Sequence, residues 1–318
     1  MRHALMLAGR ALGRVAPNPA VGCVIVSSDG RVVGRGMTQD AGRPHAETVA
    51  LAQAGEAARG ATAYVTLEPC AHLGKTSPCA DALIAAGIAR VVAAAHDPDP
   101  RVNGQGFAKL RGAGIEVVTG MMEKEAAALN AGFFFRIREN RPLVTLKLAQ
   151  SVDHKTIPPK GADRWITGKE AQRFTHLLRA KHDAILVGVN TVIEDDPELT
   201  VRLPGLEKYS PLRVVLDRKG RMPKTAKLAK PDTLVFTDGI TTVLATLAGR
   251  GVTRLLVEGG ATVAHAFRDV ADRLELFTAP RILGSEAGGD VSALPLNFVR
   301  VNERALGLDT LESYVRRA

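Results

Sequence analysis

Hydrophobic residues in the first part of the chain are grouped into short apolar runs and into segments with one apolar face. Apolar runs rich in β-branched residues predict buried strands, whereas apolar residues spaced three and four apart predict helices. The pattern predicts strands at 21–26, 31–36, 61–68, 91–96 and 115–118, and helices at 2–14, 45–54, from Pro69-Cys70 onward, in a segment ending near 112, and at 122–138. This regular alternation indicates an α/β/α sandwich.

A second series of the same kind begins after Arg141-Pro142, which makes the best boundary between two domains, 1–142 and 143–318. The pattern there predicts strands at 143–149, 183–188, 212–217, 233–236 and 252–258, a helix at 169–181 and another helix after 258. The run at 183–188 is apolar throughout, which is typical of a parallel sheet covered on both faces. A chain of 318 residues is long enough for two such α/β domains with separate cores.

The composition is that of an ordinary globular protein, with 46% hydrophobic and 24% charged residues. No apolar run approaches the roughly 20 residues that a membrane-spanning helix needs, so no membrane association is expected. The basic segment 2–14 contains no acidic residue, as in a transit peptide, but it runs directly into Pro17-Asn18-Pro19 at the entrance to the first strand. We therefore interpret it as the first helix of the domain.

One imidazole and two thiols, from His45, Cys70 and Cys79, form the clearest candidate site. These are the ligands that zinc takes in a catalytic site whose fourth position is left to water. Glu47 is two residues from the histidine, where a carboxylate can take a proton from zinc-bound water and return it to a leaving amine. The pattern is that of zinc deaminases acting on nucleobases, except that the second cysteine follows the first by nine positions rather than three.

A cysteine taken alone is more often a small buried hydrophobic residue than a metal ligand. The third cysteine, Cys23, lies in an apolar run and is interpreted in that way. For the other two, the ordered histidine, glutamate and proline positions around them favour zinc. Because two of the three cysteines are then assigned to a metal, no disulfide framework remains, which indicates a reducing cytoplasm.

The net charge of +9 is compatible with nucleic-acid binding. The basic residues are dispersed, however, and aromatic residues make up only 4% of the chain, too few for an obvious base-stacking platform. A phosphorylated substrate together with a phosphorylated cofactor explains local positive sites equally well. We therefore expect a small-molecule substrate and no nucleic-acid partner.

The second domain has no Gly-x-Gly-x-x-Gly sequence after a strand, so the ordinary dinucleotide fingerprint is absent. Instead, a strand leads into Gly259-Gly260, followed by Ala261 and Thr262 at the start of a helix, where backbone N–H groups can approach a pyrophosphate. Gly188-Val189-Asn190-Thr191 is a second such junction. Two helix starts at neighbouring strand ends favour a cofactor lying across the sheet edge. The alternative is a pair of tight turns.

The segment 66–79 resembles the zinc loop of the riboflavin-biosynthesis deaminases, and the likeness extends from Pro17-Asn18-Pro19 to Ala131-Gly132-Phe133-Phe134. It implies a cytidine-deaminase-like α/β/α domain in which the three ligands hold zinc and Glu47 moves the proton. It also implies four residues near the substrate: Asn18, His72, Lys75 and Asp97. Judged by its position between two prolines alone, Asn18 is either a hydrogen-bonding group for a pyrimidine edge or a loop cap.

The second half resembles the reductase of the same bifunctional family through five segments: 145–149, 165–168, 176–179, 195–202 and 256–260. The resemblance implies a dihydrofolate-reductase-like α/β domain that uses NADPH. It implies cofactor contacts from Ala149, Trp165, Thr191, Asp195, Gly259, Gly260, Ala261 and Thr262, and substrate contacts from Asp163, Arg179, Leu199, Arg202 and Glu258. The two arginines suit a ribose phosphate because a guanidinium group binds phosphate with two hydrogen bonds, although either could be a solvated surface charge.

Five positions depart from the family pattern. On the substrate side of the deaminase, Thr38 stands where His is common and Asp99 where Asn is common. In the reductase, His154 replaces a usual Gly, Asp163 stands where a phosphate-contacting Ser is common, and Arg218 also replaces a Ser. An acid beside the substrate phosphate would repel it, so Asp163 suggests an impaired reductase. Arg218 is a candidate partner for the 2′-phosphate of NADPH.

The resemblance implies two successive reactions of riboflavin biosynthesis. Zinc hydroxide deaminates 2,5-diamino-6-(5-phosphoribosylamino)pyrimidin-4(3H)-one, and NADPH then reduces the ribosyl to a ribityl side chain, giving 5-amino-6-(5-phosphoribitylamino)uracil. Lys147 and a water held by Asp195 are candidate proton donors for the reduction, and the alternative for Lys147 is an ordinary strand residue. A homo-oligomer, with a dimer favoured, and a cytoplasmic location are expected.

Two other classes of protein stay open at this point. One is a nucleic-acid deaminase with an unrelated C-terminal module, against which the dispersed basic residues and the widely spaced cysteines count. The other is a binding protein in which the metal has only a structural role. Glu47 counts against this second class, because a purely structural zinc site does not need a carboxylate beside its ligands.

Overall fold

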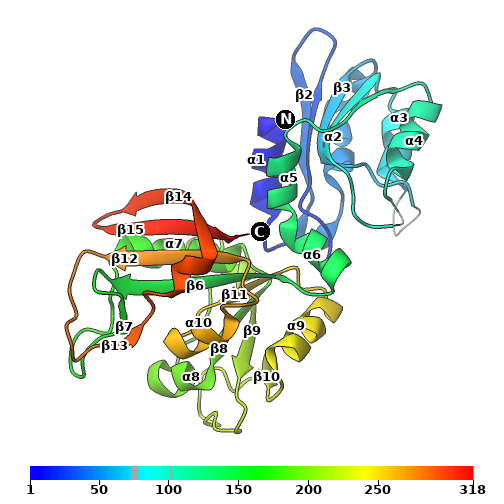
Figure 1. The fold of residues 1–318 in the computed structure, drawn as a ribbon. Helices are drawn as coiled ribbons and strands as arrows, with labels where there is room; N and C mark the ends of the chain where they lie inside the picture. The colour runs from blue at the N-terminus through cyan, green and yellow to red at the C-terminus, as the bar shows by residue number, and fades with distance from the viewer. Residues whose placement is uncertain (73–76, 101, 318) are drawn as a thin grey trace. The chain divides into compact units, whose positions relative to one another are not determined.

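The computed structural model describes residues 1–72, 77–100 and 102–317, and the chain divides into two compact units, Met1–Asn140 and Arg141–Ala318 (Figure 1). Arg141 is tied to the second unit, because its Nη1 and Nη2 atoms lie 2.7 and 2.8 Å from the two carboxylate oxygens of Asp272. The same carboxylate accepts the Val144 N–H at 2.8 Å, which fixes the start of the second sheet. Within the described residues, no helix combines the length and apolar character that crossing a membrane requires.

A five-stranded sheet forms the centre of the first unit, in the order β2-β1-β3-β4-β5. Its strands are β1 (Gly22–Val26), β2 (Val32–Met37), β3 (Thr62–Leu67), β4 (Arg90–Ala95) and β5 (Glu116–Val118). β1 pairs antiparallel with β2 and β3, whereas β3, β4 and β5 run parallel. The helices are α1 (Arg2–Ala11), α2 (Ala46–Ala54), α3 (Cys79–Ala85), α4 (Gln105–Gly112), α5 (Glu123–Leu129) and α6 (Ala131–Glu139).

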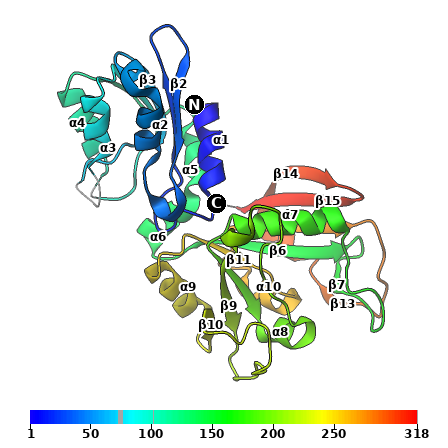
Figure 2. The same ribbon diagram turned by 180° about the vertical axis from the view of Figure 1, so that it is seen from behind.

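Glycines in β1 and β2 bring α1 and α2 close to opposite faces of this sheet (Figures 1 and 2). A Cβ atom on Gly22 would lie 1.9 Å from the carbonyl oxygen of Ala4 in α1, and one on Gly36 would lie 2.0 Å from that of Ala46 in α2. Only glycine permits such close backbone contact. The contact at Gly36 therefore fixes the first turn of α2, the turn that carries the candidate proton-transfer residue.

Two helix predictions for this unit need correction. The segment predicted as one closing helix at 122–138 is two helices, α5 and α6, which meet at Asn130. The Asn130 side chain accepts the Ala20 N–H at 2.9 Å and donates to the Ala20 carbonyl at 3.0 Å, so it connects this junction to the start of β1. The helix predicted to begin at Pro69-Cys70 begins instead at Cys79.

The second unit is built on an eight-stranded sheet in the order β10-β9-β8-β11-β6-β12-β15-β14. Its strands are β6 (Leu143–Ser151), β8 (Ala184–Gly188), β9 (Leu212–Leu216), β10 (Thr233–Phe236), β11 (Arg254–Val257), β12 (Arg273–Ala279), β14 (Phe298–Leu306) and β15 (Asp309–Arg316). The six strands from β10 to β12 are parallel, and β15 and β14 add an antiparallel edge. A separate two-stranded sheet pairs β7 (Lys155–Ile157) with β13 (Gly288–Asp290).

Helices cover both faces of this sheet, as parallel strands require. They are α7 (Lys169–Ala180), α8 (Val189–Asp195), α9 (Ile240–Gly249) and α10 (Ala261–Phe267). One apolar core joins α9 and α10 to the sheet, and a second core joins α7 and α8 to it. The strands predicted from the sequence are present, but the hydrophobic pattern gave no prediction for β12, β14 or β15.

Candidate functional site

The three predicted metal ligands come together from separate elements of the first unit. His45 lies immediately before α2, Cys70 follows β3, and Cys79 is the first residue of α3. The Nδ1 atom of His45 lies 3.2 Å from Sγ of Cys79 and 3.6 Å from Sγ of Cys70. All three possible ligand atoms lie within 4.8 Å of one another, so one ion could contact all of them.

Charge in this cluster favours a bound cation. The thiol of Cys79, the imidazole of His45 and the Cys79 N–H stabilise the Cys70 thiolate and lower its pKa to about 4. The hydrogen bond to Cys70 and burial instead raise the pKa of Cys79, so only one of the two thiols ionises easily. A divalent ion would allow both to be thiolates, and a set of one nitrogen and two sulfur ligands suits zinc. The residues present therefore fit the metal.

The location of Cys70 differs from the sequence prediction, although the expected stabilisation of its thiolate remains. Cys70 is not part of a helix, yet its sulfur accepts the N–H of Cys79, the first residue of α3, at 3.3 Å. An N–H group at a helix start stabilises negative charge. Cys23, predicted as a core residue, is completely buried in β1.

Glu47 lies in the first turn of α2, two residues from His45, and only 3% of its surface is exposed. Burial and the negative charge of Cys70 raise the pKa of its carboxyl group to about 7, although His45 opposes the shift. A carboxyl group with this pKa can both accept and release a proton near neutral pH. Its position beside the metal ligands is what proton transfer in a deamination requires.

Two of the metal ligands, His45 and Cys70, line a cavity of about 250 Å³ within the first unit, together with Glu47. Three of the four predicted substrate residues, Asn18, His72 and Asp97, line this cavity, whereas Lys75 lies outside the described residues. Nδ1 of His72 is buried and has no hydrogen-bond partner within the described chain, so it is available to a ligand. Burial and the neighbouring acids Asp99 and Glu68 raise the pKa of Asp97 to about 6.

Glu68 was not selected from the sequence, although it holds the loop that carries Asp97. Its carboxylate is buried and accepts three backbone N–H groups: Gly106 at 3.0 Å, Gly104 at 3.0 Å and Asp97 at 3.4 Å. A Cβ atom on Gly106 would lie 2.0 Å from the carbonyl oxygen of Pro69, so the first turn of α4 directly contacts the segment that leads to Cys70. The signal available in the sequence was an acid next to Pro69-Cys70, which by itself does not indicate a backbone contact.

The two departures from the family pattern in this unit both line the cavity. Thr38 is 3% exposed, and its hydroxyl accepts the Val21 N–H at 3.0 Å and lies 3.2 Å from the Pro19 carbonyl. Asp99 is also buried, and its N–H donates to Asp97 at 2.8 Å. The Thr38 hydroxyl thus bonds to the backbone of the segment that leads into β1.

In the second unit, most predicted cofactor residues follow the ends of parallel strands. Ala149 lies near the end of β6, Gly188 ends β8 immediately before α8, and Gly259-Gly260 connects β11 to α10. Strands β8, β11 and β6 are neighbours in the sheet, so these segments share its carboxyl edge, where open α/β sheets bind ligands. Thr191 and Asp195 lie on α8, and Ala261 and Thr262 begin α10.

The glycines at this edge allow close packing and leave space. A Cβ atom on Gly259 would lie 2.5 Å from Cβ of Val263, and one on Gly188 would lie 2.7 Å from a methyl group of the same valine. By contrast, a Cβ on Gly260 would meet no described atom within 4 Å. The first two glycines therefore serve the packing of α10, and Gly260 leaves its backbone accessible to a phosphate. These residues fit a nicotinamide dinucleotide.

Trp165 and Asp163 lie on the segment before α7. Trp165 has 48% of its surface exposed to solvent. Its backbone carbonyl accepts a hydrogen bond from the Arg281 side chain at 2.7 Å. The Asp163 carboxylate accepts the Trp165 N–H at 3.0 Å, so this acid supports the turn that carries the tryptophan. Asp195 and Arg218 are exposed, and the described part of the chain shows no hydrogen bond from either to the other predicted residues.

Two of the predicted substrate residues of the reductase, Arg179 and Glu258, form a buried ion pair. Nε and Nη2 of Arg179 each lie 2.8 Å from a carboxylate oxygen of Glu258. Arg179 also donates to the Thr200 carbonyl at 3.1 Å, which lies between Leu199 and Arg202. Burial alone would raise the pKa of Glu258, but Arg179 outweighs this effect and holds the pKa below its usual value.

Lys147 lies near this ion pair. Its ammonium group lies 5.3 Å from the ring centre of Phe277, and its charge interacts with those of Glu258 and Arg179. Burial lowers the pKa of Lys147, and the nearby Glu258 partly opposes this effect. A lysine with a lowered pKa is better able to give up a proton than a solvated one.

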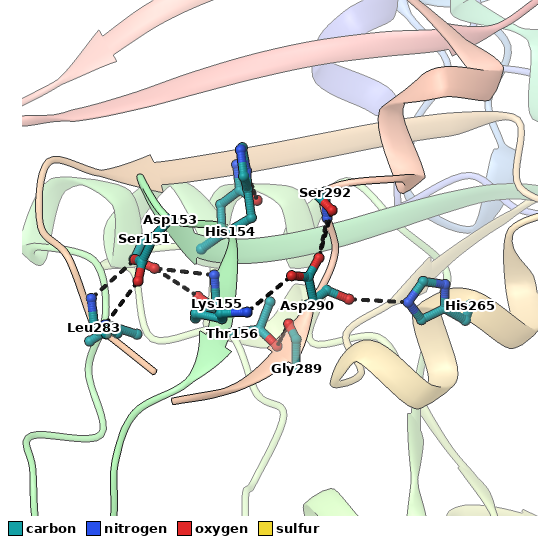
Figure 3. A network of polar contacts seen from close by, with 12 residues as sticks. Ser151, Asp153, His154, Lys155, Thr156, His265, Leu283, Gly289, Asp290 and Ser292 are labelled. Atoms are coloured by element: carbon teal, nitrogen blue, oxygen red, sulfur yellow. Dashed lines mark hydrogen bonds and ion pairs between the residues drawn. The ribbon is translucent and has the colours of Figure 1, made fainter. Parts of the chain in front are cut away.

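His154, the residue in place of the usual glycine, lies in a turn anchored to a neighbouring loop (Figure 3). Its φ angle is 61°, in the left-handed region where glycine is preferred, which explains why glycine suits this position. In Figure 3, Lys155 and His265 approach Asp290 from either side, through the carboxylate at 3.0 Å and the carbonyl at 3.2 Å. With histidine at position 154, Asp153 still accepts the N–H groups of Leu283 at 3.0 Å and Gly284 at 2.8 Å, which connect the turn to the neighbouring loop.

A histidine and two cysteines converge beside a buried glutamate on one α/β unit, and a mostly parallel sheet with glycines at its carboxyl edge forms the other. These features define a deaminase-type domain joined to a second α/β domain. Residues 1–95 match the cytidine and deoxycytidylate deaminase zinc-binding region, and residues 142–305 match the RibD C-terminal domain. The chain belongs to the RibD family of riboflavin biosynthesis proteins, which are bifunctional deaminases and reductases.

Individual relatives match over most of both chains. Riboflavin biosynthesis protein RibD of Aquifex aeolicus is 44% identical over 89% of this chain and 87% of its own length, and that of Escherichia coli is 42% identical over 91% and 89%. The solved structure of Acinetobacter baumannii RibD has a TM-score of 0.90 at 39% identity and covers 100% of this chain and 98% of its own. A deaminase/reductase from Thermotoga maritima has a TM-score of 0.89 at 36% identity, with coverage of 100% and 97%.

Proposed function

We propose that the first unit deaminates 2,5-diamino-6-(5-phosphoribosylamino)pyrimidin-4(3H)-one and that the second unit uses NADPH to reduce the product to 5-amino-6-(5-phosphoribitylamino)uracil. The observation that carries this proposal is the convergence of His45, Cys70 and Cys79 beside the buried Glu47 in a cavity. The related protein from Thermotoga maritima is described as a diaminohydroxyphosphoribosylaminopyrimidine deaminase and 5-amino-6-(5-phosphoribosylamino)uracil reductase. Both units of this chain match proteins of that kind.

In the deaminase, His45, Cys70 and Cys79 would hold zinc. When bound, zinc supplies a Lewis acid that makes water nucleophilic at neutral pH. Glu47 accepts the proton of the attacking water and delivers it to the departing amine. Asn18, His72 and Asp97 line the cavity in which the pyrimidine ring is held, and the buried Nδ1 of His72 is free to bond to it.

In the reductase, residues at the carboxyl edge of the sheet would hold NADPH, which would supply the hydride when bound. Gly260 and the first residues of α10 would hold its phosphates, and the exposed ring of Trp165 would offer it an apolar surface. Arg218 follows β9 on the same edge and is assigned to the 2′-phosphate of NADPH. Arg179, Leu199, Arg202 and Glu258 bind the substrate, and Lys147 donates the proton to the ribose carbonyl oxygen.

Asp163 is assigned a supporting role in place of a phosphate contact. Its carboxylate accepts the Trp165 N–H at 3.0 Å, and this bond gives the acid a function other than contact with a phosphate. The concern that Asp163 would impair the reductase is therefore weaker than the sequence alone suggested. Both reactions are expected to proceed.

We also propose a cytoplasmic homo-oligomer, with a dimer favoured. The strand β14 forms one edge of the large sheet, and it exposes Val299 and Val301, with 47% and 59% of their surface accessible. The unpaired backbone N–H and C=O groups of an edge strand are a site where a second chain can pair. Light scattering coupled to size-exclusion chromatography would measure the mass. A monomer at micromolar concentration would contradict this assignment.

Mass spectrometry of the diaminopyrimidine phosphate after incubation with the zinc-loaded protein tests both activities. Exchange of an amine for a carbonyl adds about 1 Da, and hydride and proton addition brings the gain to about 3 Da. The expected gain is therefore about 1 Da without NADPH and about 3 Da with it. A gain of about 1 Da in both samples would leave only the deaminase, and no change in either sample would refute the proposal.

A further inference from the structure

One histidine of the second unit lies among the residues assigned to the substrate without having a role of its own. His176 is on α7, three residues before Arg179, so the two side chains lie on the same side of the helix. The histidine is half-buried. It opens the segment 176–179, one of the five that resemble the reductase of the family.

Segment 200–202, which ends at the substrate residue Arg202, needs contacts from outside to keep its backbone in place. The residue before it, Leu199, has a φ angle of 56°, a left-handed conformation that leucine rarely adopts. Such a conformation persists only where the surrounding structure holds it. One of these contacts comes from α7, because the Thr200 carbonyl accepts a hydrogen bond from Nη1 of Arg179 at 3.1 Å.

The ring of His176 contacts the same segment at two points. Its Nδ1 atom lies 3.1 Å from the Thr200 carbonyl oxygen and 3.3 Å from the Arg202 backbone nitrogen. A ring nitrogen carries either a proton or a lone pair, so Nδ1 donates to the carbonyl in one tautomer and accepts the Arg202 N–H in the other. Together with the Val201 N–H, which donates to the Ser210 hydroxyl at 2.9 Å, these contacts hold every residue of the segment through its backbone.

His176 acts at this place as a neutral group. Burial and the positive charges of Arg179 and Arg202 lower its pKa from 6.5, and the opposing charge of Glu258 does not outweigh them. The ring is therefore uncharged at neutral pH. It follows that the histidine supplies hydrogen bonding, and not positive charge, to a site for an anionic substrate.

The two substrate arginines differ in how their side chains are held. Two hydrogen bonds of 2.8 Å to Glu258 fix the guanidinium group of Arg179. The Arg202 side chain is 54% exposed, and its Nη1 atom lies 3.5 Å from the Thr200 hydroxyl and 3.7 Å from a carboxylate oxygen of Glu198. Contacts of this length are weak. The position of the Arg202 guanidinium group therefore depends mainly on its backbone, which His176 contacts.

We propose that His176 is a positioning residue of the reductase, which holds segment 200–202 against α7 and so directs Arg202 toward the phosphate of the substrate. This inference rests on the proposed function, which assigns Arg202 to the substrate. The histidine acts through the backbone of Thr200 and Arg202, so it needs no contact with the substrate itself.

Steady-state reduction of 5-amino-6-(5-phosphoribosylamino)uracil, followed by NADPH absorbance, tests this role. His176→Phe keeps a ring but removes both contacts of Nδ1. It should raise KM for this substrate about three- to tenfold, the effect of one hydrogen bond, and leave kcat and the KM for NADPH within about twofold. His176→Asn places an amide near the position of Nδ1 and should bring KM back to within about twofold of the unchanged protein. The matched control is Arg173→Gln, an exposed residue of the same helix, which should alter none of these constants.

A double-mutant cycle shows whether the histidine acts through Arg202. Arg202→Gln removes the guanidinium group and should itself raise KM for the substrate. In that background His176→Phe should change KM less than about twofold, because no guanidinium group remains to be directed. Since KM does not depend on the fraction of the protein that is folded, partial unfolding cannot imitate this result.

Three results would overturn the positioning role: an unchanged KM in His176→Phe, an equal rise in His176→Asn, or an undiminished effect of His176→Phe in the Arg202→Gln background. A fall in kcat without a change in KM for the substrate would also overturn it. If the unchanged protein oxidises no NADPH in the presence of this substrate, the proposed function fails and the inference fails with it.

Discussion

The buried pair of Arg179 and Glu258 allows a quantitative prediction for the change Glu258→Gln. The side chains are only 12% and 10% exposed, and two hydrogen bonds of 2.8 Å join them. Glutamine removes the carboxylate that offsets the buried charges of Arg179 and Lys147. Since an uncompensated buried charge is costly, the free energy of unfolding of this unit should fall by about 3–5 kcal/mol.

The same change should alter the pH dependence of the reductase. Burial lowers the pKa of Lys147 and Glu258 raises it, so removing Glu258 lowers the pKa of Lys147 further. Protonated Lys147 is the proposed acid, and kcat therefore falls as pH rises through its pKa. In Glu258→Gln, the alkaline limb of the kcat profile should move to lower pH.

Urea unfolding followed by circular dichroism measures the first effect, and NADPH absorbance measured across a pH series measures the second. The matched control is Arg300→Gln, which removes the solvent-exposed arginine that pairs with Glu303 and Glu312 on β14 and β15 and should leave the free energy of unfolding almost unchanged. An equal loss of stability in both variants would refute the claim that burial determines the cost. An unchanged alkaline limb would show that Lys147 is not the acid.

Three further changes test other parts of the proposal. Glu47→Gln should lower the deamination rate about 10²–10⁴-fold while zinc content by metal analysis stays constant; full activity would refute its role. Arg218→Ala should reduce the preference for NADPH over NADH in measured Kd values, and an unchanged preference would remove Arg218 from the cofactor site. Burial lowers the pKa of His182 from 6.5 to about 3, so its contribution to stability is complete above pH 6.5 and is lost as pH falls toward 3. Compared with His182→Asn, the wild type should lose up to about 1.4 kcal/mol more per pH unit in urea unfolding below pH 6.5, and parallel curves would contradict this.

The sequence was most informative where chemistry restricts the choice of residue. Only a few side chains bind zinc, so His45, Cys70 and Cys79 could be selected without knowledge of the fold, and the structure brings them within 4.8 Å of one another. The apolar strands of both sheets could also be predicted, because burial on two faces leaves an unbroken hydrophobic run.

Other features depend on contacts that the local pattern does not contain. The start of α3 at Cys79 could not be inferred from residues that equally suit a helix at Cys70. Arg43 and Arg136 resemble any dispersed surface charge until the fold brings them to one cavity. The hairpin of β14 and β15 was missed because β14 is exposed over most of its length and shows no apolar face.

The carboxylate of Glu68 has a consequence for attempts to redirect the deaminase toward other pyrimidines. The Glu68 side chain accepts the N–H groups of Asp97, Gly104 and Gly106. It therefore connects the segment from Asp97 to Gly106, which borders the cavity, to the segment that carries Cys70. A library that varies residues 97–106 would therefore also disturb metal affinity. Selection for a new substrate should keep Glu68 and Gly106 constant and place its diversity at Asn18 and on α6.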